Sequence, residues 1–244
     1  MNYNRIFIRG DTHGDFSWLP AWCEENHTTK NDALIILGDA GIMYYGPTSD
    51  RERMLKEFIA KQPITLLCVR GNHEARPANY TSTTYFEIWE DDPVVPTGVY
   101  FESSYPNIKY FADGSTPLIN KRRFLIIGGA YSVDKEYRQL MGWRWFANEE
   151  LNDEEMCNIL DKIDHCKFNF VLTHTCPEDW QPKDLFLSFV DQSKVSKRME
   201  QFLTTVSEII EFDHWYFGHF HGENDDICGD GKVHMMFNNI VRLL

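Results

Sequence analysis

The sequence predicts an α/β protein that begins with a largely parallel β-sheet. Three short apolar segments near the N-terminus have the composition of strands that are covered on both faces. Two segments with helical spacing of apolar residues separate them, and this β-α-β-α-β order is typical of parallel sheets. The predicted strands are residues 6–8, 33–37 and 64–69, and the predicted helices are residues 16–25 and 50–61.

The middle of the chain has a different pattern. Residues 108–111 and 117–119 flank the dipeptide Asp113-Gly114, which is typical of hairpin turns, so we expect an antiparallel hairpin there. These antiparallel patterns indicate a second sheet. Further predicted strands are residues 124–127, 168–172, 215–217 and 233–237, and the last of these is the final strand of the chain. Further predicted helices are residues 148–163 and 195–212. The first of these helices begins with an acidic run at 149–155, which we expect to be solvated. Residues 75–107 and 131–147 are the least regular, and we expect them to form loops at a substrate site.

Length and composition restrict the class of protein. A chain of 244 residues that is 43% hydrophobic can bury a substantial core, and without repeats or linkers we expect one domain over residues 1–244. Lys and Arg total 24 against 37 Asp and Glu, which gives a formal charge of −13. Because an acidic surface repels phosphate backbones, extended nucleic-acid binding is not expected. A small phosphate ester is still possible, since bound metal ions reverse the local charge.

The N-terminus and the cysteines bear on the compartment. The first predicted strand begins at residue 6, which leaves no room for a removable leader, and no apolar stretch is long enough to cross a membrane. The six cysteines form no CxxC pair, and we interpret them as reduced thiols. We therefore expect a cytoplasmic protein with no membrane partner, while the oligomeric state is not predicted.

Five short polar segments, each directly after a predicted strand, carry side chains that bind metal ions. Open α/β sheets bind ligands at the carboxyl ends of their strands, so these segments can converge. Asp11 and His13 are two residues apart, which at a strand end puts both side chains on one face, and His219 and His221 repeat this spacing. The segments are GDTHGD at residues 10–15, LGD at 37–39, RGNHE at 70–74, TH at 173–174 and GHFH at 218–221.

The donor atoms of these segments indicate which metals they suit. Carboxylate, amide oxygen and imidazole without thiolate suit Mn²⁺, Fe²⁺ or Fe³⁺, or Zn²⁺. Seven ligands are too many for one ion, but they suit two ions that share a carboxylate. Since only Asp11 and Asp39 among them are charged, two divalent ions would leave the site positive and able to attract a phosphate.

Taken in order, DxH, GD, GNHE, a histidine after a strand and GHxH resemble the motifs of the calcineurin-like metallophosphoesterase superfamily. The motifs span residues 11–221, so the resemblance covers nearly the whole chain, and the ordered set is much more specific than any single motif. The resemblance implies a four-layer α/β/β/α sandwich with two mixed β-sheets flanked by helices. It also implies hydrolysis of a phosphate ester through in-line attack by a hydroxide that bridges two metal ions.

The resemblance also assigns roles to individual residues. His73 would face the leaving-group oxygen and donate a proton or a hydrogen bond to it. Asp39 would bridge the two ions. One ion would be bound by Asp11, His13 and His221, and the other by Asn72, His174 and His219.

The second motif departs from the relatives it otherwise resembles. GDTHG and RGNHE are most similar to the serine/threonine protein phosphatases and diadenosine-tetraphosphate hydrolases, which carry GDxxDRG. Here Ile42 and Met43 replace the aspartate that orients the catalytic histidine and the arginine that clamps phosphate. Glu74 and Asp15 are alternatives for orienting His73. The closing GHFH is more typical of nucleotidases and phosphodiesterases, so protein-phosphatase specificity does not transfer.

Three arginines in the irregular segments, Arg76, Arg138 and Arg144, are candidates for binding the phosphate, because guanidinium groups make bidentate contacts with it. Surface ion pairs are the alternative for each of them. Trp143 and Trp145 have two interpretations, stacking on a nucleobase or packing in the core, and core packing is favoured.

The sequence therefore predicts a dinuclear-metal-dependent phosphoesterase that hydrolyses a phosphomonoester, on either a phosphoprotein or a small metabolite. The enzymatic alternative is a phosphodiesterase or dinucleoside-polyphosphate hydrolase. A non-catalytic scaffold with the same fold is the alternative from another class. Because all seven ligands and His73 are present, the enzyme is favoured.

Overall fold

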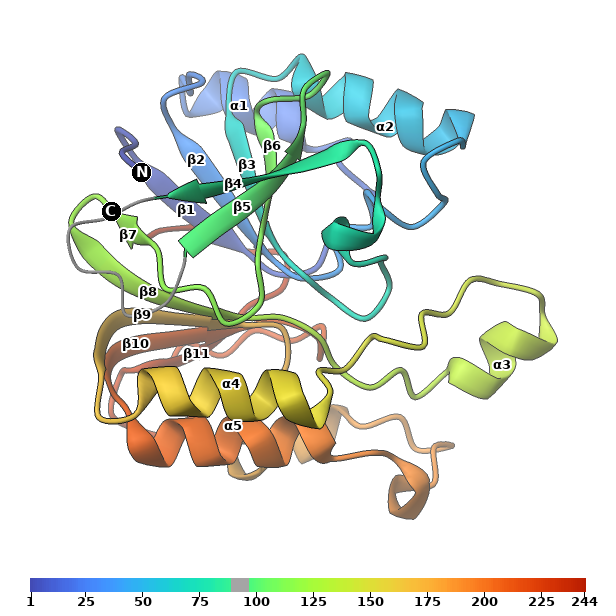
Figure 1. Ribbon diagram of the computed structural model, residues 1–244, viewed down its shortest axis with the longest axis vertical. Helices are drawn as coiled ribbons and strands as arrows, with labels where there is room; N and C mark the ends of the chain where they lie inside the picture. Colours follow the sequence, from blue (N-terminus) through green and yellow to red (C-terminus); the bar gives the residue numbers. More distant parts are fainter. Residues whose placement is uncertain (89–96) are drawn as a thin grey trace.

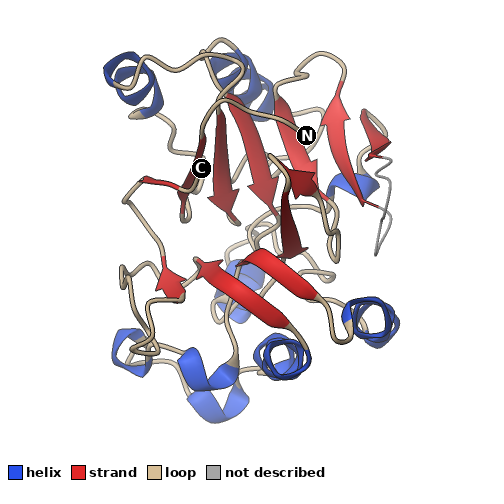
Figure 2. Cartoon of the chain, turned by 90° about the vertical axis from the view of Figure 1, so that its left-hand side faces the viewer, coloured by secondary structure: helices blue, strands red, loops and turns tan. Residues whose placement is uncertain are grey.

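The computed structural model describes residues 1–88 and 97–244, and its elements stack in four layers, α/β/β/α (Figure 1). Two β-sheets face each other in the middle. Helices α1 (Leu19–Glu25) and α2 (Asp50–Ala60) cover one outer face, and α4 (Asp153–Ile163) and α5 (Arg198–Ile209) cover the other (Figure 2). The short helix α3 (Lys135–Leu140) projects from the side of these layers. The predicted four-layer sandwich is confirmed.

Seven strands of the described residues form the first sheet, in the order β12-β1-β2-β3-β6-β5-β4. Strands β1, β2, β3 and β6 are parallel, whereas β12, β5 and β4 make antiparallel pairs. Ile36 pairs with Arg9 and with Cys68, so the first three strands end level with one another. The bounds are β1 (Ile6–Arg9), β2 (Ala33–Leu37), β3 (Thr65–Val69), β4 (Thr83–Ile88), β5 (Thr97–Glu102), β6 (Ile108–Phe111) and β12 (Val241–Arg242).

The second sheet has, in the described part of the chain, five strands in the order β11-β10-β9-β8-β7. All pairs are parallel except β7 with β8. Thr173 pairs with both Ile127 and Phe217, so three strands of this sheet also end together. The bounds are β7 (Leu118–Ile119), β8 (Arg122–Ile127), β9 (Lys167–Thr173), β10 (Glu211–Phe217) and β11 (Val233–Met235).

Strand β2 shows why these apolar runs form central strands. Successive side chains point to opposite faces of a sheet. Leu34 and Ile36 accordingly pack with the helix-covered cluster, and Ala33, Ile35 and Leu37 pack between the two sheets. All five side chains are fully buried, so both faces of the strand require apolar residues.

The predicted hairpin around Asp113-Gly114 is wrong. Strand β6 lies between β3 and β5 in the first sheet, whereas β7 pairs with β8 in the second. The turn, in which Gly114 has a φ of 72°, therefore carries the chain from one sheet to the other. The prediction failed because local turn residues do not specify which strands pair. The second sheet also differs from the antiparallel pattern expected for it, since most of its strand pairs are parallel.

Three further predictions need correction. The strand at 233–237 is not the last, because β12 follows it and pairs with β1. The irregular segment 75–107 contains β4 and β5, and its residues 89–96 lie outside the described residues. Helix α4 begins at Asp153 rather than at 148, because Asn152 and Glu155 form a capping box at its start.

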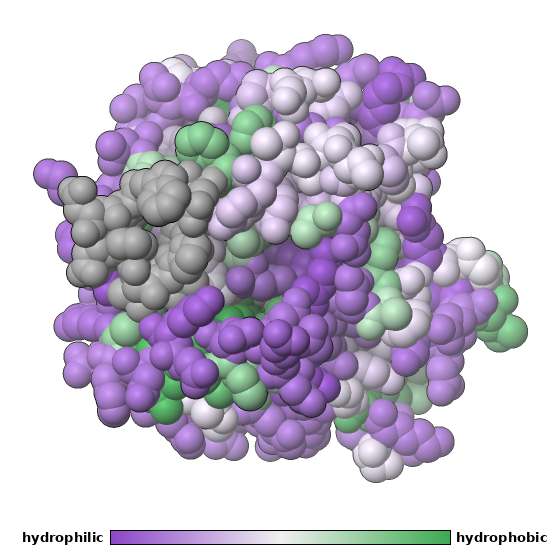
Figure 3. Space-filling view, in the orientation of Figure 1, coloured by the Kyte–Doolittle hydropathy of each residue, from purple (hydrophilic) through white to green (hydrophobic). Residues whose placement is uncertain are grey.

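The described residues include no helix that is both long and apolar enough to cross a membrane. The face in Figure 3 is mostly hydrophilic, with apolar colour on the projection around α3. Leu140 on this projection is 82% exposed and Trp143 is 52% exposed, so Trp143 does not pack in the core as predicted.

Candidate metal centre

The polar segments converge where β1, β2 and β3 of one sheet and β9 and β10 of the other end. Asp11 and Asp39 are both buried there, each 2% exposed. Three groups of side chains bring possible ligand atoms within 4.8 Å of one another: Asp11, His13 and His221; His13, Asp39 and His73; and Asp11, Asp39 and His174. Asp11, His13 and Asp39 each belong to two of these groups, so the three groups are contiguous.

Asp11 has one satisfied and one unsatisfied oxygen. Its Oδ1 accepts a hydrogen bond from the backbone N–H of His219 at 2.9 Å. Its Oδ2 is buried and accepts no hydrogen bond from the described residues. That oxygen lies 3.3 Å from Nε2 of His221 and 3.8 Å from Nε2 of His13. A buried carboxylate oxygen beside two imidazole nitrogens fits a bound cation, because leaving it unpaired is costly.

His174 also presents its free nitrogen to acceptor atoms. Its Nδ1 lies 2.8 Å from the carbonyl oxygen of Leu37 and donates to it. Its Nε2 lies 2.8 Å from Oδ1 of Asn72 and 3.6 Å from Oδ2 of Asp39. Burial lowers the pKa of His174, but Asp39 and Asp11 outweigh burial and raise it to about 9. The three atoms thus favour a positive charge between them, which either a proton or a metal ion supplies.

Four predicted ligands have a left-handed backbone. The φ angles of His13, Asp39, His219 and His221 are 48°, 46°, 67° and 53°. This conformation costs on the order of 1–3 kcal/mol per non-glycine residue and is concentrated at functional sites. The strain is consistent with side chains that are positioned for binding.

Two glycines of the motifs are required by close approach. A Cβ on Gly38 would overlap the His174 ring, and one on Gly71 would overlap the Asp39 carboxylate. Because glycine has no Cβ, these ligands can approach the backbone of neighbouring strands.

A family model described as calcineurin-like phosphoesterase matches residues 4–223 of the chain, which include all five polar segments. The chain belongs to the calcineurin-like phosphoesterase family. The family implies metal-dependent hydrolysis of phosphoesters, and the donor atoms described above fit metal ions. No curated protein matches the chain.

A buried chain of hydrogen bonds fixes the Asn72 amide of this phosphoesterase. Asn72 Nδ2 donates to Ser132 Oγ at 2.9 Å, and Ser132 Oγ donates to Glu149 Oε2 at 2.6 Å. Ser132 N and Trp145 Nε1 also donate to the Glu149 carboxylate. The amide oxygen of Asn72 is thereby directed at His174. Glu149 is 3% exposed, so the predicted solvated acidic run is wrong at this position.

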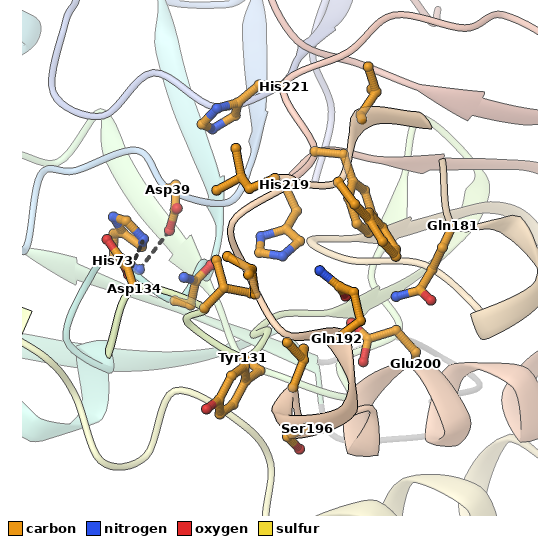
Figure 4. A pocket seen from close by; sticks show the side chains of 18 of the residues that line it. Asp39, His73, Tyr131, Asp134, Gln181, Gln192, Ser196, Glu200, His219 and His221 are labelled. Carbon is orange, nitrogen blue, oxygen red and sulfur yellow. Dashed lines mark hydrogen bonds and ion pairs between the residues drawn. The ribbon is translucent and has the colours of Figure 1, made fainter. Parts of the chain in front are cut away.

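The His73 ring lies beside two residues at the N-terminal end of α3, Arg138 within the helix and Asp134 at its N-cap. Its backbone N–H donates to Asp39 Oδ1 at 2.7 Å. Nη2 of Arg138 contacts both ring nitrogens and lies 3.1 Å from Nε2. Oδ1 of Asp134 lies 4.0 Å from Nε2 (Figure 4). Nε of Arg138 also donates to Oδ2 of Asp134 at 2.7 Å. Burial lowers the pKa of His73, an effect that Asp39 opposes and Arg138 strengthens.

The two carboxylates suggested from the sequence do not contact the His73 ring. Glu74 Oε1 instead accepts the Gly71 N–H at 3.0 Å, and Asp15 accepts from Ser17. Sequence reasoning missed Asp134. Its only pattern, an acid four residues before Arg138, is typical of an ordinary ion pair on a helix surface.

A cavity of about 260 Å³ adjoins the metal centre, and none of the three candidate arginines is among the described residues that line it. Arg76 forms an ion pair with Glu155 and donates to the carbonyl of Asn148. Arg144 donates to the carbonyl of Tyr45. Of the three, only Arg138 contacts the predicted catalytic residue His73, and Arg138 itself does not line the cavity.

Proposed function

We propose that the chain is a dinuclear-metal phosphoesterase that hydrolyses a phosphomonoester. The main support is the position of Asp39, a buried carboxylate that is shared between two groups of possible ligands. The proposed ligands of one ion are Asp11, His13 and His221, those of the other are Asn72, His174 and His219, and Asp39 is common to both. Mn²⁺, Fe²⁺ or Fe³⁺, and Zn²⁺ suit this set.

Charge favours a monoester over a diester. Two divalent ions carry four positive charges, and Asp11, Asp39 and the attacking hydroxide carry three negative charges, so the site stays positive. A positive site attracts a phosphomonoester dianion more strongly than a diester, which carries one negative charge. When bound, the ions would polarise the phosphoryl oxygens and lower the pKa of water in the site.

His73 is the proposed proton donor to the leaving-group oxygen. It lies at the edge of the centre, with its backbone fixed by Asp39. Asp134 and Arg138 contact its ring and would act through it, so we assign them as positioning residues. The negative charge of Asp134 favours the protonated ring, and the phosphate of a bound substrate would do so as well.

Turnover by the Mn²⁺-reconstituted chain on an aryl phosphomonoester and the matching diester tests this proposal. We expect monoester turnover that exceeds diester turnover. His73→Asn should lower kcat by about 10²–10⁴-fold with metal binding retained. The loss should be smaller for 4-nitrophenyl phosphate than for an alkyl phosphate, because a good leaving group needs no proton.

His165→Asn is the control, since it makes the same substitution at a histidine that lies outside the motifs and has a side chain that is 90% exposed. It should leave turnover unchanged. Diester preference would overturn the monoester assignment. If the metal-loaded chain turned over neither ester, the non-catalytic scaffold would be favoured instead.

A further inference from the structure

After its last motif the chain returns from the second sheet to the first. Residues 236–240, which we call the crossing segment, connect β11 to β12. The N–H of Met236 donates to the carbonyl of Phe217 at the end of β10 at 2.8 Å, and the carbonyl of Phe237 accepts from the N–H of Gly10, directly after β1, at 3.1 Å. A Cβ on Gly10 would overlap the backbone of Met236 and Phe237. The crossing segment is therefore bonded to, and packed closely against, strand ends that lead into the metal centre.

Phe237 in the crossing segment places its ring on the imidazole of His221. The two ring centroids are 4.8 Å apart and the ring planes differ by 20°, which is a stacked contact. Nε2 of His221 faces His13 and Asp11, whereas its Nδ1 has no hydrogen-bond partner among the described residues. Imidazole ligands of metals are almost always oriented by a hydrogen bond from the second ring nitrogen. In His221 the face of the Phe237 ring is the contact that can set this orientation.

The exposure of His221 explains why its orientation matters. Its side chain is 48% exposed, whereas that of His174, whose Nδ1 donates to the carbonyl of Leu37, is fully buried. An exposed ring loses rotational freedom when it binds an ion, and a ring that is already held in place loses less. An aromatic face also attracts positive charge, which a bound ion would place on the imidazole. Both effects make the stack with Phe237 favourable for binding an ion.

Two charged side chains hold the crossing segment in place. Glu223 follows His221 by two residues, and its Oε1 accepts the N–H groups of both Asn238 and Asn239 at 2.6 Å. Arg9, the last residue of β1, donates to the carbonyl of Asn238 at 2.7 Å and to its Oδ1 at 2.9 Å. The motif that contains His221 and the segment that contains the stacking ring are thus joined directly beside the stack.

We propose that Phe237 is a positioning residue for one metal ion, the one for which Asp11, His13 and His221 are proposed ligands, and that it acts by orienting the His221 ring. Glu223 acts less directly, by holding the crossing segment. Among the described residues, Phe237 stacks on none of the ligands proposed for the other ion. The inference rests on the ligand set of the proposed function, and it expects the crossing segment to affect one ion and not the other.

Calorimetric titration of the full chain, freed of metal by chelation, with Mn²⁺ tests the proposal without turnover. Phe237→Ala should weaken the affinity of one ion about three- to tenfold, the effect of losing one aromatic pair, and should leave the affinity of the other unchanged. Phe237→Tyr keeps the ring and should keep the wild-type affinity. In a chain that already carries His221→Ala, Phe237→Ala should cause no further loss, because Phe237 acts through this imidazole.

Phe212→Ala is the matched control. Phe212 is also partly buried and also packs on an aromatic ring, that of Trp215 at a centroid distance of 5.4 Å, but it lies near the opposite end of β10 from the motif. This variant should lower the thermal stability of the metal-free chain without weakening either ion. Glu223→Ala, at an exposed position, is a second variant that keeps the Phe237 side chain, and it should weaken the same ion as Phe237→Ala does.

Unchanged affinities in Phe237→Ala, equal weakening of both ions, or a loss that persists beside His221→Ala would overturn the inference. If Phe237→Ala does not fold, unchanged affinities in Glu223→Ala would overturn it. The proposed function fails in a different way. A wild-type chain that binds two ions and turns over no phosphate ester would contradict the hydrolysis alone, whereas turnover together with Mn²⁺ affinities that do not respond to Phe237→Ala would contradict the positioning role alone.

Discussion

Replacing Ser132 by alanine should weaken one metal site and leave the other unchanged. Ser132 is not a proposed ligand, but its hydroxyl accepts from Asn72 Nδ2 at 2.9 Å and donates to Glu149 Oε2 at 2.6 Å. The variant would leave the Asn72 amide N–H₂, in a residue 3% exposed, without that partner. The amide could then rotate its oxygen away from His174.

The expected magnitude follows from the lost contact. A buried donor left without a partner costs about 1–3 kcal/mol. Since 1.4 kcal/mol is a factor of ten in a dissociation constant, the affinity of the ion bound through Asn72 should fall about 10–100-fold. The other proposed ion, for which Asp11, His13 and His221 are proposed ligands, should keep its affinity, because the Ser132 hydroxyl bonds to Asn72 and Glu149 instead.

Competition with a chromogenic chelator, or calorimetry with Mn²⁺, would measure both affinities in the same titration. Ser103→Ala is the control, because Ser103 is exposed and lies far from the motifs in sequence. Equal weakening of both ions, or no weakening of either, would refute the role assigned to the Ser132 hydrogen bonds.

Three further predictions concern a glycine, a positioning residue and a buried acid. Gly38→Ala should abolish binding of one ion and should lower the thermal stability by more than Gly142→Ala does. Both glycines have a positive φ, but only a Cβ at Gly38 would meet a neighbour, the His174 ring. Equal losses of thermal stability in the two variants would contradict this. Asp134→Asn should lower kcat for an alkyl phosphomonoester about tenfold with KM nearly unchanged, since the Asp134 carboxylate lies 4.0 Å from Nε2 of His73 and its negative charge favours the protonated ring; an effect on KM alone would argue for substrate binding instead. Burial raises the pKa of Glu200 to about 7 from 4.5, so between these pH values the folded chain binds more protons than the unfolded chain. The free energy of unfolding therefore falls as the pH rises from about 4.5 to about 7. Urea unfolding of the metal-free protein at pH 5 and pH 8 should show that Glu200→Gln removes up to about 3 kcal/mol of this fall; an identical pH dependence in both proteins would contradict it.

The central strands were predictable because their burial is visible in composition. Both faces of β2 are covered, so the run Ala33–Leu37 is apolar throughout, and its predicted bounds agree with the structure. Strand β4 was missed because it lies at the edge of its sheet, where Tyr85 and Phe86 are both more than 40% exposed and no clear alternation marks the strand.

The site was predictable to the extent that its residues occur in motifs. Asp11 and Asp39 follow buried strands, and parallel strands bring such ends together. Asp134, Ser132 and Glu149 come from a segment without a motif, and they reach the site only through the path of the chain around α3. No local pattern specifies that path, so these contacts could be identified only in three dimensions.

Metal stoichiometry measured together with turnover tests the central claim most directly. Purified chain saturated with Mn²⁺ and freed of excess metal should retain two ions per chain and hydrolyse a phosphomonoester. Asp39→Asn should lose at least one ion and nearly all turnover, because this carboxylate is common to two ligand groups. Turnover that is unchanged in Asp39→Asn, or a wild-type chain that binds no metal, would contradict the account.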